Sequence, residues 1–273
     1  MTDRYAVIGT PIGHSKSPLI HGAFAQPTGQ DIQYTAIEGP LDGFRATVEA
    51  FIAQGGKGMN VTIPFKLQAF EIATDPMESA RLAGAVNALK FEGGRIYAQN
   101  FDGLGLVNDI QRNLGVSLAG KRVLICGAGG ATRGAILPIA AQQPAVIAIA
   151  NRTAAKAHGL KADFAAHTTL QTGGYDELAG ETFDVVLNAT STGLSKDALP
   201  LPAGVFAPGA LAYDLVYGKG LTTFLQQAQA AGVTQLADGV GMLVEQAAEA
   251  FEWWRGVRPN TQPVIARFTI PLV

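Results

Sequence analysis

The chain has 273 residues, of which 48% are hydrophobic and 15% charged, and its formal net charge is −2. This length exceeds what one core usually organises, so we expect two packed lobes, and the apolar composition is typical of an α/β protein with buried parallel strands. The near-neutral charge gives no electrostatic basis for binding nucleic acid or an anionic membrane. No apolar stretch approaches the roughly 20 residues that span a bilayer.

The few cysteine and histidine residues argue against disulfides and metal sites. Cys126 is the one cysteine and cannot form an internal disulfide, so we expect a cytoplasmic protein and a buried thiol. Residues 1–8 lack the pattern of a signal peptide. The histidines lack metal-ligand spacing, so no metal is expected. His14 and His21 are expected in a turn and on a helix surface.

The first hundred residues predict alternating strands and helices. Helical spacing of apolar residues predicts a helix over 41–54, and another is expected over 65–74. Ser17-Pro18 predicts a further helix start, with Ser17 as the N-cap. Strand-like apolar runs occur at 5–8, 58–63, 85–91 and 95–98. The last two of these runs flank a Gly-Gly hairpin turn.

From Leu104 onward strands alternate with helical spacers. A helix is predicted over 104–113 and another over 242–254, where apolar residues share one face. The alternation predicts a parallel sheet with right-handed crossovers. Its strands are predicted at 123–126, 145–150, 184–187 and 210–213.

A glycine-rich loop follows the strand predicted at 123–126 and precedes an Ala-rich helix. Gly127 and Gly129 match the first two glycines of a dinucleotide fingerprint, which permit a tight turn and let backbone N–H groups approach a pyrophosphate. Thr132 stands at the third glycine position. The strand–loop–helix placement favours dinucleotide binding over a plain tight turn. The candidate cofactor contacts in this loop are Gly127, Ala128, Gly129, Gly130 and Ala131.

The next strand, 145–150, ends without a carboxylate, in Asn151, Arg152 and Thr153. NAD-binding versions usually carry an acid here that bonds the ribose 2′-hydroxyl. A guanidinium pairs instead with a 2′-phosphate, and Lys156 adds positive charge close by. A solvated arginine on a loop is the alternative, but at this strand end the pattern predicts NADP.

Polar side chains stand at strand ends in the first lobe, where packing alone does not favour them. Each one has a structural explanation as a cap, a turn residue or a solvated lysine. As a group they indicate a binding site, and they are Ser15, Ser17, Asn60, Thr62, Lys66, Asn87 and Asp102.

Together with other blocks, these residues resemble the shikimate dehydrogenase family along the whole chain. The resemblance implies two lobes around a cleft: a substrate-binding catalytic lobe, 1–103 completed by 240–273, and a Rossmann-like NADP-binding lobe, 104–239. Besides the glycine-rich loop, the matching blocks are Ile12-Gly-His-Ser-Lys-Ser-Pro18, Asn60-Val-Thr-Ile-Pro-Phe-Lys66, Ala83-Gly-Ala-Val-Asn87, Asn100-Phe-Asp-Gly103, Asn151-Arg-Thr153, Asn188-Ala-Thr-Ser191, Tyr213-Asp-Leu-Val-Tyr217 and Asp238-Gly-Val-Gly-Met-Leu243 through Gln246.

The resemblance also implies residue roles. Ser15 and Ser17 would donate to the substrate carboxylate, and Lys66 would be the catalytic acid/base, paired with Asp102. Asn60 would support the groups that bond the ring hydroxyls, and Tyr217 would lie near substrate and nicotinamide. The groups bonding the ring hydroxyls would be Thr62, Asn87, Asp102 and Gln246. Around the nicotinamide would lie Asn188, Thr190, Leu215, Gly239 and Met242.

The implied reaction is the reversible, NADP-dependent reduction of 3-dehydroshikimate to shikimate. Hydride arrival builds negative charge on the carbonyl oxygen, which a lysine ammonium can stabilise and protonate while a carboxylate orients it. The family implies a cytoplasmic enzyme of aromatic amino acid biosynthesis through chorismate. It implies a monomer or homodimer.

Phe101 departs from the family pattern, which usually has threonine before the aspartate. Its ring either packs away from the site or crowds Lys66 and Asp102; crowding predicts that Phe101→Thr raises kcat/KM for shikimate. Three alternatives to the leading function therefore stay open. They are a quinate/shikimate dehydrogenase accepting NAD, a low-activity paralogue acting on a shikimate-like substrate, and a non-catalytic sensor of shikimate-like ligands.

Overall fold

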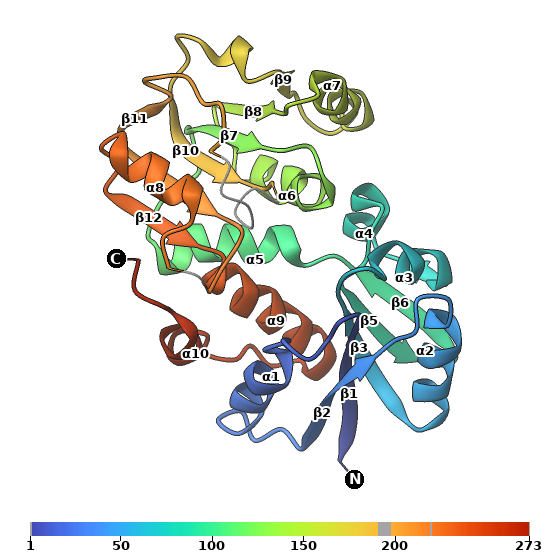
Figure 1. The fold of residues 1–273 in the computed structure, drawn as a ribbon. Coiled ribbons are helices and arrows are strands. Elements are labelled where there is room, and N and C mark those ends of the chain that lie inside the picture. Colours follow the sequence, from blue (N-terminus) through green and yellow to red (C-terminus); the bar gives the residue numbers. More distant parts are fainter. Residues whose placement is uncertain (1, 191–197, 219, 273) are drawn as a thin grey trace. The chain divides into compact units, whose positions relative to one another are not determined.

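The computed structural model describes residues 2–190, 198–218 and 220–272, and the chain divides into two compact units. Unit 1 comprises Met1–Gly105 and Val244–Val264, and unit 2 comprises Leu106–Leu243 and Ile265–Val273. Each unit contains a six-stranded sheet with helices, which confirms the α/β class (Figure 1). Ser191, quoted with one of the motifs, lies outside the described residues.

The sheet of unit 1 is mixed, with strand order β2-β1-β3-β5-β6-β4. β1 is parallel to both β2 and β3. β5 is antiparallel to both of its neighbours, β3 and β6, and together with β6 it forms the predicted hairpin. The edge strand β2 was not predicted, because its half-exposed residues carry no strong apolar pattern. The strands are β1 (Asp3–Gly9), β2 (Ile32–Glu38), β3 (Gly56–Val61), β4 (Asp75–Pro76), β5 (Ala88–Glu92) and β6 (Arg95–Gln99).

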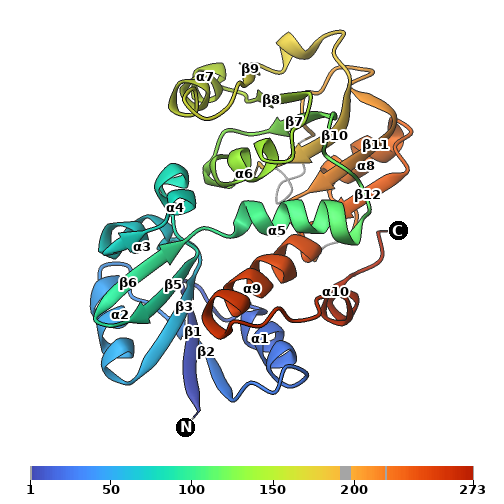
Figure 2. The same cartoon turned by 180° about the vertical axis from the view of Figure 1, so that it is seen from behind.

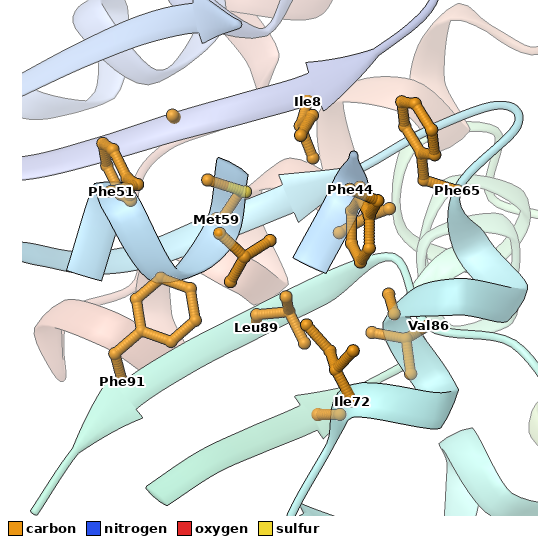
Figure 3. Packing of buried hydrophobic residues seen from close by; sticks show 14 of the residues in the cluster. Ile8, Phe44, Phe51, Met59, Phe65, Ile72, Val86, Leu89 and Phe91 are labelled. Atoms are coloured by element: carbon orange, nitrogen blue, oxygen red, sulfur yellow. The ribbon is translucent and has the colours of Figure 1, made fainter. Parts of the chain in front are cut away.

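One face of this sheet packs against α2 (Phe44–Ala53) and α3 (Lys66–Ile72), and α4 (Glu78–Ala83) follows β4. Figure 3 shows side chains such as Phe44 and Met59 meeting in this core. Burying each such side chain contributes about 1.5–3 kcal/mol, so the core holds the carboxyl ends of β1 and β3 firmly in place.

The opposite face packs against α1 (Ser17–Ala25) and the C-terminal part of α9 (Val240–Arg255), which Figure 2 shows from behind. Trp254 donates from Nε1 to the carbonyl oxygen of Leu89 on β5 at 3.0 Å, and its ring stacks on Tyr5 with centroids 4.8 Å apart. Phe24 and Phe251 meet edge to face. These contacts explain why residues 244–255 belong to unit 1.

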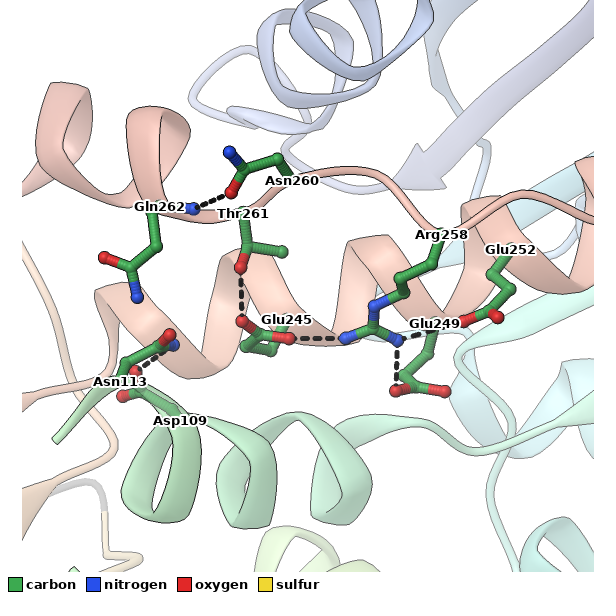
Figure 4. Close-up of polar contacts among 9 residues, drawn as sticks. All are labelled: Asp109, Asn113, Glu245, Glu249, Glu252, Arg258, Asn260, Thr261 and Gln262. Carbon is green, nitrogen blue, oxygen red and sulfur yellow. Dashed lines mark hydrogen bonds and ion pairs between the residues drawn. The ribbon is translucent and has the colours of Figure 1, made fainter. Parts of the chain in front are cut away.

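The segment after α9 is tied back to the helix by a charge cluster around the buried Glu245, shown in Figure 4. Arg258 donates to Glu245 at 2.5 Å and also bonds Glu249 and Glu252. Thr261 donates to the other oxygen of Glu245 at 2.6 Å. Because Glu245 is only 2% exposed, these partners supply the hydrogen bonds that water would otherwise give.

Two expectations about α1 are wrong. Lys16, not Ser17, is at the N-cap, and no side chain caps the helix. Ser17 is instead the first residue of the helix, and it is buried. His21 is fully buried rather than on the helix surface, because this helix face is covered by the aromatic side chains of α9 and β2.

Unit 2 has an all-parallel sheet, as predicted from the alternating pattern. Its strand order is β12-β11-β10-β7-β8-β9. This is the doubly wound order, with its topological switch between β7 and β10. The strands are β7 (Arg122–Cys126), β8 (Val146–Ala150), β9 (Gln171–Gly173), β10 (Phe183–Asn188), β11 (Phe206–Asp214) and β12 (Gln235–Asp238).

The helices of unit 2 connect these strands. α6 (Gly130–Ala140) follows β7, α7 (Ala154–Asp163) follows β8, and α8 (Thr223–Ala230) packs on β11 and β12. The helix predicted over 104–113 is α5 (Asp102–Asn108) followed by a π-helical turn (Asp109–Asn113). A 3-10 turn (Asp176–Leu178) lies between β9 and β10, and α10 (Gln262–Phe268) follows α9. No helix of the described residues could cross a membrane.

Candidate active site

Lys66 and Asp102 meet in unit 1. Lys66 is the first residue of α3 and Asp102 the first of α5, and Lys66 Nζ donates to Asp102 Oδ2 at 2.5 Å. A turn bond from Phe65 N to Thr62 O carries the chain from β3 into α3. The side chains are 31% and 17% exposed, so a bound molecule could reach both. The fold thus brings together two predicted residues that are 36 positions apart.

Asn87 connects this pair to a third predicted residue. Its Nδ2 donates to Asp102 Oδ1 at 2.8 Å and, at 3.4 Å, to Gln246 Oε1. Its Oδ1 accepts from the backbone N–H of Phe101 at 2.8 Å. Asn87 is 3% exposed, and its hydrogen bond to Oδ1 orients the Asp102 carboxylate.

Of the remaining predicted substrate residues of unit 1, Asn60 lies on β3 and Thr62 directly after it, while Ser15 lies on the loop after β1 and Ser17 begins α1. Asn60 donates to the carbonyl oxygen of Asn87 at 3.2 Å, and Ser17 N donates to Ser15 Oγ at 3.3 Å. A Cβ on Gly9 would lie 2.5 Å from Thr62 Cγ2, so the close approach of the loop to β3 requires glycine there.

The ring of Phe101 packs into a small apolar cluster. It contacts Ala88 and Ala250 and lies edge to face on Trp253, with centroids 5.7 Å apart. Only 5% of the residue is exposed. Of the two sequence alternatives, these contacts support packing away from the site.

Two polar residues that bond predicted site residues, Asn100 and Tyr34, were not identified from the sequence as members of the site. Asn100 Oδ1 accepts from Asp102 N at 3.1 Å, while its Nδ2 donates to Ala85 O. Its position two residues before Asp102 is a capping signal that could have identified it. Tyr34 donates to Asn60 Oδ1 at 2.6 Å. An isolated tyrosine on a polar edge strand carries no such signal.

In unit 2, the glycine-rich loop has the shape that a pyrophosphate requires. Gly127 has φ +109°, and a Cβ there would lie 2.9 Å from Thr190 Cγ2. Gly129 is at the N-cap of α6, and added Cβ atoms on Gly129 and Gly130 would meet open space. Thr132, at the third glycine position, donates to the carbonyl oxygen of Gly127 at 2.8 Å and so closes the turn. Ala128 and Ala131 complete the predicted loop, at the start of α6 and beside the switch point.

The end of β8 presents positive charge to solvent. Arg152 and Lys156 are exposed, and Asn151 Nδ2 donates to the carbonyl oxygen of Thr153 at 2.9 Å, which holds the turn into α7. Residues 151–156 contain no carboxylate. This turn can therefore accept an additional phosphate without like-charge repulsion.

The residues predicted around a nicotinamide lie at or after the ends of β10, β11 and β12, which are neighbours in the sheet. Asn188 Oδ1 accepts from Thr190 N at 3.1 Å and from Thr190 Oγ1 at 2.6 Å. Leu215 N donates to Asn188 O at 3.0 Å, and a Cβ on Gly239 would overlap the carbonyl oxygen of Leu215. Tyr217 also belongs to unit 2 and is 40% exposed.

Met242 is held by a buried pair that the sequence did not suggest. Its backbone N donates to Tyr213 Oη at 3.3 Å, and Tyr213 donates to Asp109 Oδ2 at 2.7 Å. A Cβ on Gly241 would overlap the Asp109 carboxylate. Burial and the Asp109 carboxylate raise the pKa of the Tyr213 phenol, which keeps it protonated as the donor.

Cys126 is buried at the end of β7, and burial raises the pKa of its thiol. Within residues 2–190, 198–218 and 220–272, no group of three or more His, Cys, Asp or Glu side chains could hold a metal ion.

Comparison with known proteins agrees with this geometry. Residues 7–89 match the model of the shikimate dehydrogenase substrate binding domain, and residues 109–195 match shikimate / quinate 5-dehydrogenase. Residues 239–267 match the shikimate 5′-dehydrogenase C-terminal domain. The chain belongs to the shikimate dehydrogenase family.

Several members of the shikimate dehydrogenase family are similar over their full length. A protein of Nitrosospira multiformis named shikimate dehydrogenase (NADP(+)) is 56% identical over 97% of this chain and 96% of its own. One of Dechloromonas aromatica with the same name is 55% identical over 100% of both chains.

Solved structures share the fold. An Ael1 enzyme from Pseudomonas putida is 58% identical, with a TM-score of 0.96 over 100% of both chains. Shikimate 5-dehydrogenase from Thermus thermophilus, in complex with NADP(H) and shikimate, is 29% identical, with a TM-score of 0.86 over 98% of this chain and 100% of that one. The chain therefore has the same α/β fold as these solved structures over nearly its whole length.

Proposed function

We propose that the chain is an NADP-dependent shikimate dehydrogenase that interconverts 3-dehydroshikimate and shikimate, with Lys66 and Asp102 as the acid/base pair. The observation that carries the proposal is the 2.5 Å contact between Lys66 Nζ and Asp102 Oδ2, oriented by Asn87 and accessible to solvent. In this proposal unit 1 is the substrate-binding catalytic domain and unit 2 the NADP-binding domain.

In the direction of reduction, Lys66 supplies the proton. Its ammonium stabilises the negative charge that develops on the carbonyl oxygen and donates a proton from Nζ to that oxygen. In the oxidation direction the neutral amine accepts the proton from the substrate hydroxyl. Asp102 holds Nζ through Oδ2, while Asn87 bonds Oδ1, so the carboxylate keeps its orientation in both directions.

The polar residues around the pair suit a small polyhydroxylated acid. Ser15 and Ser17 offer hydroxyl donors for the carboxylate. Thr62, Asn87 and Gln246 offer donors and acceptors for ring hydroxyls. Asn60 acts behind them, through its bond to the Asn87 backbone. Tyr217 would contribute from unit 2.

The residues of unit 2 fit NADP. Backbone N–H groups around Gly127 and Gly129 would bind the pyrophosphate, and Arg152 and Lys156 would bind the 2′-phosphate, while Asn151 and Thr153 shape that turn. When bound, the cofactor supplies or accepts the hydride. The residues after β10 to β12 would surround the nicotinamide, and they are Asn188, Thr190, Leu215, Gly239 and Met242.

Steady-state assays of NADP+ reduction with shikimate test the proposal. We expect turnover by the unsubstituted chain and a loss of about 10²–10⁴-fold in kcat for Lys66→Ala, the usual contribution of a general acid/base. Lys57→Ala is the matched control, because Lys57 is an exposed lysine of β3 and should leave kcat unchanged. Equal kcat for Lys66→Ala and the unsubstituted chain would contradict the assigned role.

The same assay separates the alternatives. Faster turnover with quinate and NAD+ would favour the quinate/shikimate dehydrogenase. Tight binding of shikimate without turnover would favour the sensor. We also propose a cytoplasmic enzyme that is a monomer or a homodimer, which cell fractionation and light scattering would test.

A further inference from the structure

Two loops at the carboxyl end of the sheet of unit 2 lie against each other. Residues 215–218 follow β11 and residues 239–240 follow β12, which are neighbouring strands. Gly239 N donates to the carbonyl oxygen of Val216 at 3.3 Å, and a Cβ on Gly239 would overlap the carbonyl oxygen of Leu215. In the proposed function Leu215 and Gly239 lie around the nicotinamide, so the fit between the two loops shapes that end of the cofactor site.

Each of these loops begins at a carboxylate. Asp214 ends β11 and Asp238 ends β12, and the two residues are paired in the register of the sheet. Asp214 Oδ1 accepts from Val216 N at 3.0 Å. Asp238 Oδ1 accepts in the same way from Val240 N at 3.1 Å. Both contacts are Asx turns, in which a side chain bonds the backbone two residues further on, so the two loops start with the same local shape.

The second oxygens of the two carboxylates have different partners. Asp214 Oδ2 accepts from the Thr222 hydroxyl at 2.6 Å. Asp238 Oδ2 accepts from Gly218 N, in the neighbouring loop, at 3.2 Å. Asp238 therefore binds one backbone N–H group of each loop. Burial raises the pKa of this carboxyl, and the bonds from Val240 and Gly218 oppose that shift because they stabilise the charged form.

We propose that Asp238 is a positioning residue of the nicotinamide site, which holds the loop 215–218 in place through its bond to Gly218 N. Gly218 has no side chain to pack, and the neighbouring Tyr217 is 40% exposed, so the backbone bond fixes this end of the loop. The inference rests on the proposed binding of NADP by unit 2.

The two halves of the cofactor should respond differently to the loss of this bond. The pyrophosphate and the 2′-phosphate are assigned to the loop after β7 and the turn after β8. The bonds of Asp238 described above hold the segments after β11 and β12 instead. Loss of the bond to Gly218 should therefore weaken binding of NADP+ but not of 2′-phospho-ADP-ribose, the part of NADP+ that lacks the nicotinamide. A general loss of folding would weaken binding of both.

Asp238→Asn removes the bond between the loops selectively. The amide oxygen can still accept from Val240 N, but the amide nitrogen is a donor and faces the Gly218 N–H. We expect the Kd for NADP+, measured by calorimetry, to rise about tenfold, the loss of one hydrogen bond to a charged group, and the Kd for 2′-phospho-ADP-ribose to change less than about twofold. Asp184→Asn is the matched control. Asp184 accepts from Arg122 N at the amino end of the same sheet, and its substitution should leave both dissociation constants unchanged.

A second pair of variants tests the loop without removing a buried charge. Gly218→Ala places a side chain at φ +77° in open space. Relief of this strain turns the N–H of residue 218 away from Asp238, so the same difference between the two ligands is expected. Gly204→Ala is the control, because Gly204 has φ +80°, also in open space, but lies in the segment before β11. It should leave both dissociation constants unchanged.

These measurements can overturn the inference separately from the proposed function. An unchanged Kd for NADP+ in Asp238→Asn or in Gly218→Ala, or equal changes for the two ligands, would overturn the inference alone. If thermal unfolding shows that Asp238→Asn does not fold, the glycine pair decides. Binding of NADP+ by the unsubstituted chain without turnover of shikimate would contradict the proposed function, and the inference would still be tested by the dissociation constants. Absence of NADP+ binding by the unsubstituted chain would overturn both.

Discussion

His21 should make the stability of unit 1 depend on pH. Burial lowers the pKa of His21 from 6.5 to about 3, and the hydrogen bond to Asn60 opposes this shift only in part. Below pH 6.5 the unfolded chain takes up a proton at this residue, whereas the folded chain does not until about pH 3. The stabilising contribution is therefore complete above pH 6.5 and is lost as the pH falls toward 3.

The size of the effect follows from linkage. Each pH unit in this window costs about 1.4 kcal/mol, so the free energy of unfolding should fall by about 2 kcal/mol between about pH 7.5 and about pH 5. Tyr34, which stacks on the ring, does not titrate here, because burial raises the pKa of its phenol. The other rings around His21 are apolar or uncharged: Phe24, Phe251 and Trp254.

His21→Gln is the matched variant, since an amide can still donate to Asn60 but does not titrate. At about pH 7.5 it should be less stable by about 1–2 kcal/mol, because the stacking and part of the buried ring surface are lost. Urea titrations followed by tryptophan fluorescence report on unit 1, which contains both tryptophans, Trp253 and Trp254. The advantage of histidine should vanish by about pH 5. Parallel stability curves for the two proteins would refute the reasoning, because every other titrating group is common to both.

Three further substitutions, the last of them with a matched control variant, test the site and its supports. Phe101→Thr should lower the free energy of unfolding by about 2–4 kcal/mol without raising kcat/KM for shikimate, because it leaves a cavity beside Trp253; a higher kcat/KM would instead support crowding. Arg152→Glu should raise KM for NADP+ about 100-fold and leave KM for NAD+ nearly unchanged, measured with both cofactors, because a carboxylate repels the 2′-phosphate. Gly241→Ala should lower the melting temperature, because the new Cβ overlaps the Asp109 carboxylate. Gly159→Ala is the control, because a Cβ on Gly159 in α7 would meet open space. This substitution should raise the melting temperature slightly, since alanine has the higher helix propensity. Equal melting temperatures for the two variants would count against the packing argument.

Local patterns in the chain were enough to predict the α/β class, the parallel sheet of unit 2 and its glycine-rich loop. A strand followed by Gly127 and an Ala-rich helix carries its own backbone requirement, because φ +109° is accessible mainly to glycine. The absence of a carboxylate in 151–156 is likewise visible without coordinates. Lys66 and Asp102 were selected by motif resemblance, and their contact agrees with that selection.

Burial and partners could not be inferred in the same way, because they depend on which faces of distant elements pack together. His21 is buried because α9, more than 200 positions away, covers α1 (residues 240–255 against 17–25). Tyr34 donates to Asn60 because β1 pairs with both β2 and β3 and so brings these two distant residues within reach of each other. The packing of Phe101 on Trp253 also depends on a helix that is distant in sequence. The ring is buried against the apolar surface of that helix, which comes close only in the folded chain.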